Sequence, residues 1–342
     1  MKRFLQTLLL AATLVGGAWA LYYRDQIHSV QDALQLARQQ LFASTWVDQA
    51  SGPNSILAGY QTAGPDAEGR IPLLTPSTEW RRGMGQIRIA TFCLTTDSNP
   101  IDRRRIDRLA EIIQRFDVVS IQDENRSGVV QQVVAELNRR GGHFRFVERR
   151  DSDRSLAIVF DEATIHLDQS HWYSVNDPDR VLSCEPLVAW FRARHAPPHQ
   201  AFTFTIVNLQ LDPARPDQEL PFIGELFRSV RNDGRGEDDV ILTGDFRCGD
   251  RGLSMIRSAT GLEWVVSNQA TNTRNDQQQA NLVFNPDATG EFTGSGGVFD
   301  LMQRLNLTLA DAMSLSEQMP VWGEFSIYEG QTVGRVTSGN RP

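Results

Sequence analysis

Two short apolar stretches of this sequence each run into an acidic residue, the residue type that metal-assisted chemistry requires. Residues 240–249 read VILTGDFRCG, where a run long enough for a buried strand meets Gly244 and then Asp245. Residues 117–123 read DVVSIQD and finish on Asp123. A carboxylate just beyond a core strand faces a cleft at the sheet edge, where it can meet a metal ion or water. Two such acids favour metal-assisted phosphoester hydrolysis, and an ordinary strand followed by an Asp turn is the alternative.

The elements that must position these acids alternate between strands and helices at first and are mostly strands later. We expect helices to begin at Pro100 and to cover 129–139 and 216–230. The predicted strands are 86–92, 117–123, 143–147, 156–160, 185–193, 201–209, the stretch before Gly244, 262–266, 281–284 and 321–327. This order predicts an α/β domain with mixed sheets.

The N-terminus predicts export. Lys2 and Arg3 precede a largely apolar run at 4–23, about the 20 residues that span a bilayer. Residues 18–20, AWA, fit a signal-peptide cleavage site, so a removed signal peptide competes with a retained membrane anchor. We favour the anchor because residues 21–23, LYY, prolong the apolar run. In both cases the remainder is extracytoplasmic, either membrane-anchored or secreted into the periplasm or medium.

The rest of the chain divides by composition. After the signal peptide or anchor at 1–23, residues 24–43 show near-helical apolar spacing, typical of a juxtamembrane helix or a short coiled-coil stalk. Residues 44–84 are rich in Ser, Gly, Pro, Thr and Asp and predict a flexible linker. The globular domain is expected at 85–330, followed by a tail at 331–342.

Composition limits the function. A chain of 342 residues with 40% hydrophobic content can bury one large core or two smaller ones. The net charge of −8 argues against broad attraction to nucleic acid. Three cysteines are too few for a disulfide framework.

From about residue 86 to 329, the chain resembles the endonuclease/exonuclease/phosphatase superfamily, which has the deoxyribonuclease-I-like fold. The resemblance implies a four-layer α/β sandwich, with two mixed β-sheets packed face to face and helices on the outside. Its members use Mg²⁺ and a His/Asp pair to hydrolyse phosphodiesters or phosphomonoesters. Six segments in family order carry the match: 92–94 (for W-N-x), 117–123 (strand ending L-Q-E), 207–213 (N-x-H-x-x-P), 244–247 (G-D-F-N), 280–284 (D-x-I-x-x) and 316–322 (S-D-H-x-P-V).

The same comparison predicts that the family site is largely replaced. A carboxamide has no proton to exchange near neutral pH, an arginine is a permanent cation, and Mg²⁺ tolerates displaced ligands poorly. Asp245 alone is unchanged. The replacements are Gln318 for the proton-handling His, Gln210 for the phosphate-contacting His, Arg247 for the water-orienting Asn, Ala280 for Asp, Cys93 for the metal-site Asn, Asp123 for Glu and Glu317 for Asp.

Three functions follow from this pattern. The favoured one is a pseudoenzyme that acts as a binding or interaction domain and needs no cofactor. The alternative is an active phosphodiesterase, nuclease or phosphatase that uses Mg²⁺ or Mn²⁺ in a rearranged site. The third binds a phosphorylated ligand through Gln210 and Arg247 without cutting it. The partner is therefore a phosphorylated ligand or a protein, with the membrane met through the N-terminal segment.

The residues to follow in the structure are those at family positions. By resemblance, the catalytic positions are Asp245, Glu317, Gln318, Gln210 and Arg247, and the metal positions are Asp123 and Cys93. We expect the Arg247 guanidinium to lie among Asp123, Asp245 and Glu317 and to neutralise them as a metal ion would. Cys93, Cys184 and Cys248 could line one cleft as a thiolate metal site or a disulfide, although unpaired cysteines usually pack as small apolar groups.

Overall fold

The computed structural model describes residues 85–94, 102–123, 128–150, 154–177 and 179–330. The segments expected as signal peptide or anchor, juxtamembrane helix, linker and C-terminal tail lie outside these residues. Within the described ranges, no helix has the length and hydrophobicity needed to cross a bilayer.

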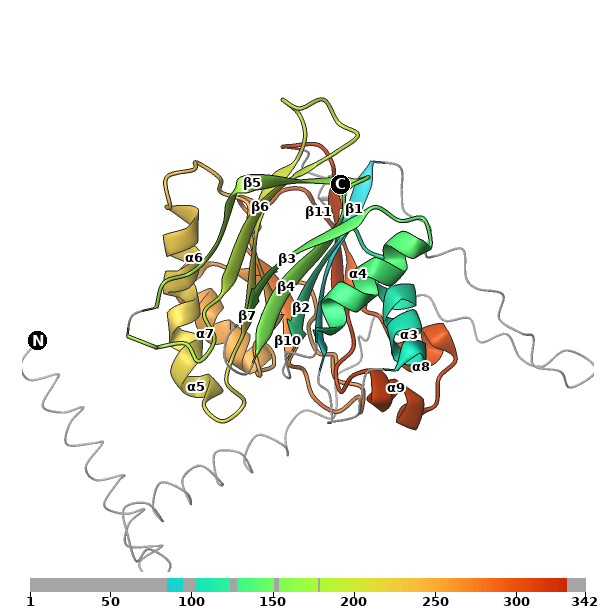
Figure 1. Cartoon of the computed structure of the whole chain (residues 1–342). Coiled ribbons are helices and arrows are strands. Elements are labelled where there is room, and N and C mark those ends of the chain that lie inside the picture. Colours follow the sequence, from blue (N-terminus) through green and yellow to red (C-terminus); the bar gives the residue numbers. More distant parts are fainter. Residues whose placement is uncertain (1–84, 95–101, 124–127, 151–153, 178, 331–342) are drawn as a thin grey trace, which may run out of the picture. The chain divides into compact units, whose positions relative to one another are not determined.

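Twelve strands form two six-stranded sheets (Figure 1). Each sheet has one parallel pair near its centre, β1–β2 in the first and β7–β8 in the second, and its other pairs are antiparallel. Both sheets are therefore mixed, as predicted. The first sheet has the order β11 (Phe292–Val298), β12 (Val321–Ser326), β1 (Gln86–Leu94), β2 (Val118–Asp123), β4 (Ser155–Asp161) and β3 (Phe144–Arg150). The second has the order β5 (Ile165–Ser174), β6 (Leu187–Ala193), β7 (Thr203–Gln210), β8 (Val240–Asp245), β10 (Ala280–Phe284) and β9 (Glu263–Trp264).

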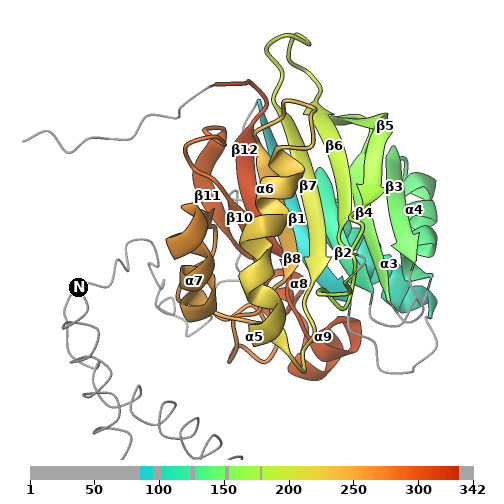
Figure 2. The same ribbon diagram turned by 90° about the vertical axis from the view of Figure 1, so that its left-hand side faces the viewer.

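Helices cover the outer face of each sheet, which makes four layers (Figures 1 and 2). Apolar faces of the helices pack onto the strands, because an amphipathic helix must bury its apolar stripe. On the first sheet lie α3 (Arg103–Ile113), α4 (Val129–Arg139), α8 (Leu301–Leu305) and α9 (Leu309–Leu315). On the second lie α5 (Pro216–Glu219), the 3₁₀ turn η2 (Leu220–Phe222), α6 (Ile223–Arg231) and α7 (Asp250–Thr260).

The inner faces of the two sheets meet in an aromatic core. Phe204 stacks on Phe191 and on Phe202, with ring centroids 5.7 and 4.8 Å apart, and Phe202 stacks in turn on Phe325 of the other sheet. Burying one such ring stabilises the fold by about 1.5–3 kcal/mol. This core holds the two sheets together and so sets the distance between their strand ends.

A polar ladder replaces the apolar core where the parallel strands approach their carboxyl ends. Thr243 Oγ1 of β8 donates to Ser120 Oγ of β2 at 2.6 Å. One step further along, Gln122 Nε2 donates to Asn208 Oδ1 of the opposite sheet at 2.6 Å and to Thr91 Oγ1 at 3.0 Å. All of these side chains are buried, and buried polar groups that are fully hydrogen-bonded favour one arrangement. The ladder therefore registers one sheet against the other.

The described domain also contains elements that the sequence pattern did not predict. Strand β5 alternates poorly because half of it is exposed at a sheet edge, and β11 is glycine-rich. Helices α7, α8 and α9 were missed as well. The helix expected at 216–230 is divided into α5, η2 and α6, because Pro221 has no N–H to donate within a continuous helix.

Gly244 provides a test of this frame, because it has φ +150° and its missing Cβ would lie 1.9 Å from Leu209 O. Replacement Gly244→Ala should therefore push β8 away from β7 and lower the free energy of unfolding by at least about 3 kcal/mol. Urea unfolding measures this loss. In the strand control Gly297→Ala the added methyl meets nothing within 4 Å, so the change should stay within about 0.5 kcal/mol. Equal effects of the two substitutions would contradict the close approach.

Candidate functional site

The candidate site lies where the parallel strands of both sheets end. The register places Gln210, the last residue of β7, beside Asp245, the last residue of β8. On the other side of β8, Ala280 of β10 is the partner of Asp245. In the first sheet, β1 and β2 run parallel and bring Cys93 beside Gln122. The carboxyl ends of β1, β2, β7 and β8 and the start of β10 thus meet at one end of the sandwich.

Asp245 is the centre of this group. Its side chain is 0% exposed, and donors of the chain itself engage both carboxylate oxygens. Gln318 Nε2 donates to Oδ2 at 2.5 Å, and the Arg247 backbone N–H donates to Oδ1 at 3.1 Å. Arg247 Nε lies 2.7 Å from Oδ2, so the two side chains form an ion pair. The Nε–H group does not have hydrogen-bond geometry toward that oxygen. The one unchanged acid of the site is therefore bound by the chain's own amide and guanidinium.

Arg247 adopts a backbone conformation that suits a different residue type. Its φ is +51°, in the left-handed region that asparagine tolerates several-fold better than most residues. The resemblance puts an asparagine at this position. Arg247 thus retains the turn that an asparagine favours while placing a cation on Asp245.

Gln318 is positioned by a hydrogen-bond chain that starts on β1. Ser316 Oγ donates to the Cys93 backbone carbonyl at 2.6 Å and accepts from the Gln318 backbone N–H at 2.9 Å. This chain ties the turn before β12 to the end of β1. Gln318 Oε1 is buried and has no hydrogen-bond partner among the described residues. The side-chain Nε2 of Gln318, and not its Oε1, is therefore directed at Asp245.

Gln210 and Cys93 complete the buried group. Gln210 is 1% exposed, and its Nε2 donates to Cys93 Sγ at 3.7 Å. The Cys93 side chain in turn hydrogen-bonds to Asp245 and lowers the pKa of that carboxyl. Gln210, expected to contact substrate, is thus directed at a neighbouring strand.

Burial is the largest influence on the ionisation of Asp245. It raises the pKa of this carboxyl above its usual value, and the Arg247 charge and the Gln318 hydrogen bond work against that rise. A carboxylate taken out of water is costly unless a cation lies beside it. Arg247 supplies that cation.

Two expected members of the site are placed less centrally. Glu317 is exposed, and its carbonyl accepts from the Thr273 amide at 2.8 Å. Asp123 ends β2 in register with Leu94 and Ser155, and its side chain lies outside the described residues. Of the three carboxylates expected around Arg247, the contact described is the one with Asp245.

The disulfide considered for the three cysteines is not formed. Cys184 packs in the core between the sheets. Cys248 packs under the helices of the second sheet, where burial and then the Asp245 charge raise its pKa to about 12.

The described residues around Asp245 do not fit Mg²⁺ or Mn²⁺. Mg²⁺ requires oxygen ligands in near-octahedral geometry at about 2.0–2.1 Å. Here a guanidinium lies on Oδ2, an amide N–H donates to each carboxylate oxygen, and the neighbouring Cys93 offers sulfur. A second cation beside Arg247 would also be repelled by it.

The sequence argument overlooked the residues that hold the site in place. Gln122 and Asn208 stand in matched motifs and Ser316 opens another, but their part in the ladder and in the Gln318 chain depends on contacts between sheets. A polar residue inside an otherwise apolar strand was the available signal, since such a group requires a partner when buried.

The Arg247–Asp245 pair yields a stability prediction. Replacement Arg247→Ala leaves a buried carboxylate without this cation and should lower the free energy of unfolding by about 3 kcal/mol or more at pH 8. Burial already raises the pKa of Asp245 in the folded state, and without the Arg247 charge this pKa rises further. At pH 4 the buried carboxyl is then protonated and needs no cation, so the loss of stability should be smaller than at pH 8. Urea unfolding at both pH values measures this difference.

The matched control for this prediction is the double variant Asp245→Asn/Arg247→Ala. An amide at position 245 needs no cation, so the double variant should lose much less stability than Arg247→Ala alone and show little added pH dependence. Additive losses from the two substitutions would contradict a coupled pair.

Comparison with known proteins agrees with this architecture. No protein-family model matches the sequence. Human deoxyribonuclease gamma is 23% identical over 264 residues, which cover 69% of this chain and 84% of that protein. Deoxyribonuclease-1-like 1 of Sus scrofa is 24% identical over 243 residues, covering 65% of this chain and 74% of that protein.

Solved structures share the fold at low sequence identity. D. rerio TDP2 complexed with a single-strand DNA product has a TM-score of 0.52 at 12% identity, covering 70% of this chain and 99% of that one. The human Nocturnin catalytic domain with bound sulfate has a TM-score of 0.51 at 11% identity, covering 71% and 95%. The similarity to deoxyribonucleases, together with two mixed sheets between helical layers, agrees with the resemblance to the endonuclease/exonuclease/phosphatase superfamily.

Proposed function

We propose that residues 85–330 form a binding or interaction domain on the endonuclease/exonuclease/phosphatase scaffold, with the metal-dependent site replaced by Arg247 and Gln318. The observation that carries this proposal is the state of Asp245. Its carboxylate is wholly buried and engaged by an amide and a guanidinium of the same chain. Such a group is not available to hold an ion or to orient an attacking water.

The histidine that handles the proton in the family is also replaced in this chain. Gln318 has no proton to exchange near neutral pH, so it cannot act as a general base or acid. The described histidines belong to segments at the opposite end of the sandwich from Asp245. His171 pairs with Asp168 there, and the others are His143, His166, His195 and His199. The side chains described as shifting the pKa of Asp245 are those of Arg247, Gln318 and Cys93, and none of them is a histidine.

A protein partner fits the site better than a phosphorylated ligand. Gln210 is 1% exposed and the Arg247 side chain 14% exposed, and both contact Cys93 or Asp245. Donors turned inward in this way have little surface left for a phosphate. The relatives are named as deoxyribonucleases, but the net charge of −8 gives this chain no general attraction to DNA. We further propose that the domain is exported, with its N-terminal segment as membrane anchor.

A hydrolysis assay tests the proposal. The purified full-length chain, given a generic phosphodiester and a phosphomonoester with Mg²⁺ or Mn²⁺, should show no turnover above that of Asp245→Asn. The reason is that the site lacks both a metal position and a general base. Metal-dependent turnover that disappears in Asp245→Asn would instead establish the alternative, an active phosphoesterase with a rearranged site.

The displacement of the metal by Arg247 can be tested in the reverse direction. Arg247→Asn removes the cation from the Asp245 carboxylate and suits the left-handed backbone, so Mg²⁺ should bind measurably more tightly than to the unchanged protein. Titration calorimetry is the measurement. Arg247→Lys, which keeps the positive charge, is the matched control and should gain nothing. Equal Mg²⁺ affinity of Arg247→Asn and the unchanged protein would refute the replacement.

A further inference from the structure

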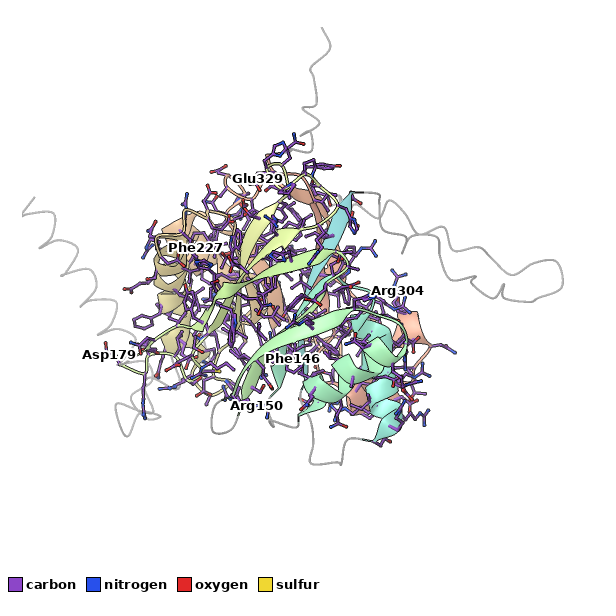
Figure 3. All side chains as sticks on the ribbon, turned by 45° about the horizontal axis from the view of Figure 1, so that its top comes forward. Phe146, Arg150, Asp179, Phe227, Arg304 and Glu329 are labelled. Carbon is purple, nitrogen blue, oxygen red and sulfur yellow. The ribbon has the colours of Figure 1, made fainter. Side chains whose placement is uncertain are left out.

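A second group of carboxyls lies at the other end of the sandwich from Asp245. Asp239 directly precedes β8, whereas Asp245 ends that strand. Glu291 directly precedes β11, and Glu329 follows β12. One carboxylate oxygen from each of these three residues lies within 4.8 Å of the other two. Figure 3 shows Glu329 at this end, away from Arg150, which ends β3 beside the carboxyl end of β2.

The group is buried but incompletely hydrogen-bonded. Asp239 and Glu291 are 2% and 1% exposed, yet Asp239 Oδ1 and Glu291 Oε2 have no hydrogen-bond partner among the described residues. Thr289, 2% exposed, lies beside Asp239, and its hydroxyl is equally without a well-formed hydrogen bond in the described part. One carboxylate oxygen of each of the two buried acids thus has no partner among the described residues, where each would cost about 1–3 kcal/mol.

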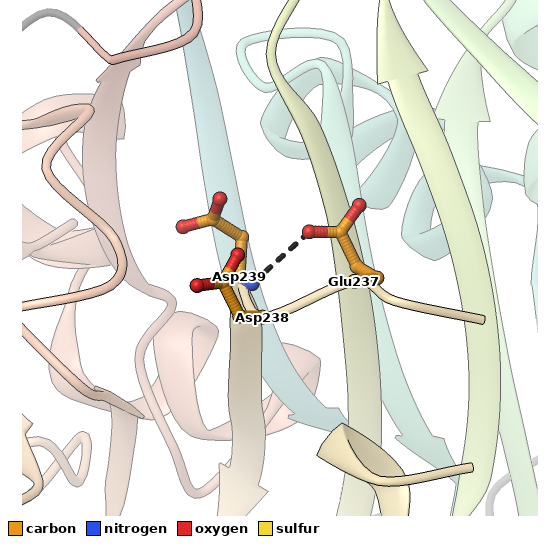
Figure 4. A group of neighbouring side chains, drawn as sticks. All are labelled: Glu237, Asp238 and Asp239. Carbon is orange, nitrogen blue, oxygen red and sulfur yellow. Dashed lines mark hydrogen bonds between the residues drawn. The ribbon is translucent and has the colours of Figure 1, made fainter. Parts of the chain in front are cut away.

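The surrounding charges are negative. Glu237 and Asp238 directly precede Asp239, and one carboxylate oxygen from each of these three residues lies within 4.8 Å of the other two. Within the described part of the chain, no Lys or Arg forms an ion pair with Asp239, Glu291 or Glu329. Figure 4 shows Asp239 beside Glu237 and Asp238, with its amide donating to Glu237 Oε1 at 3.0 Å. Buried carboxylates of this kind are costly to ionise unless a positive charge lies beside them.

The remaining carboxylate oxygens are held in fixed directions. Glu291 Oε1 accepts from the Gly330 amide at 2.6 Å, and Glu329 Oε2 accepts from the Thr203 amide at 3.0 Å. Each of these acids therefore has one oxygen occupied by the backbone, which orients the other. Outer hydrogen bonds of this kind are what pre-orients ligands at metal sites.

We propose that Asp239, Glu291, Glu329 and the Thr289 hydroxyl form a binding site for one divalent cation, with Ca²⁺ as the best fit. All the donors are oxygens, the preference of hard cations. Ca²⁺ accepts six to eight ligands in irregular geometry, so water can complete a set that four side chains begin. Glu329 is exposed, which gives the ion a path from solvent.

The bound ion would join the two sheets. Asp239 directly precedes β8 of the second sheet, whereas Glu291 and Glu329 flank β11 and β12 of the first. The backbone bridge between Ala201 and Tyr328 already connects the sheets at this end. The site shares no residue with the Asp245 group, so it stands whether or not the domain hydrolyses phosphoesters.

Terbium luminescence gives a direct readout, because Tb³⁺ replaces Ca²⁺ at oxygen sites and emits when a nearby tryptophan is excited. Trp190 Nε1 donates to Glu237 Oε2 at 2.8 Å, which places an indole beside the group. The full-length chain, stripped with chelator, should show saturable Tb³⁺ emission that added Ca²⁺ displaces. Ca²⁺ should also raise the thermal unfolding midpoint, since an ion that binds the folded state stabilises it. Trp190→Phe should lower the emission but keep the Ca²⁺-dependent rise in the midpoint.

Matched substitutions locate the ion. Glu291→Gln and the exposed Glu329→Gln should weaken Ca²⁺ binding by at least about tenfold, the loss that follows removal of even an outer hydrogen-bond partner. Asp238→Asn removes the same charge from an exposed neighbour outside the proposed ligand set and should weaken binding much less than Glu291→Gln. Failure of Ca²⁺ to displace Tb³⁺ or to raise the midpoint would overturn the site. So would an Asp238→Asn loss as large as that of Glu291→Gln.

Discussion

The carboxylate of Asp245 can remain buried at the junction of the two sheets because a guanidinium lies beside it. Taking a carboxylate out of water costs several kcal/mol unless an opposite charge and hydrogen bonds compensate. Arg247 supplies the charge, and Gln318 and the Arg247 amide supply hydrogen bonds. The left-handed turn at Arg247, the Ser316 hydrogen bonds and the polar ladder all serve to keep these groups in place.

Under the proposed function, the scaffold persists although its chemistry has changed. The strands that carry the site are held by an apolar core and by the close approach of Gly244 to Leu209, and neither depends on a metal ion. In a metal-dependent hydrolase, positive charge at such a strand end comes from the ion. Here an arginine provides positive charge from within the chain. Fold and function can therefore separate at a few residues.

The two ends of the sandwich present opposite electrostatic situations. At the Asp245 end, an acid from β8 is neutralised by the chain itself. At the Asp239 end, acids from both sheets meet without a described counter-charge, which is why an external cation fits there. The same strand, β8, connects the two groups, so the ion proposed at one end bears on the stability of the frame that holds the other.

The sequence alone was sufficient to predict the α/β sandwich, its mixed sheets and the central strand that ends at Asp245. Those features follow from local apolar runs, from turn residues and from motif order, which survive at low identity. Edge strand β5, glycine-rich β11 and the divided helix around Pro221 escaped because edge position and packing override local pattern. The substitutions Gln318 and Arg247 were readable, whereas their contact with Asp245 was not. That contact, the core position of Cys184 and the meeting of Asp239 with Glu291 and Glu329 join residues far apart in the chain, and only the packing of one sheet on the other decides them.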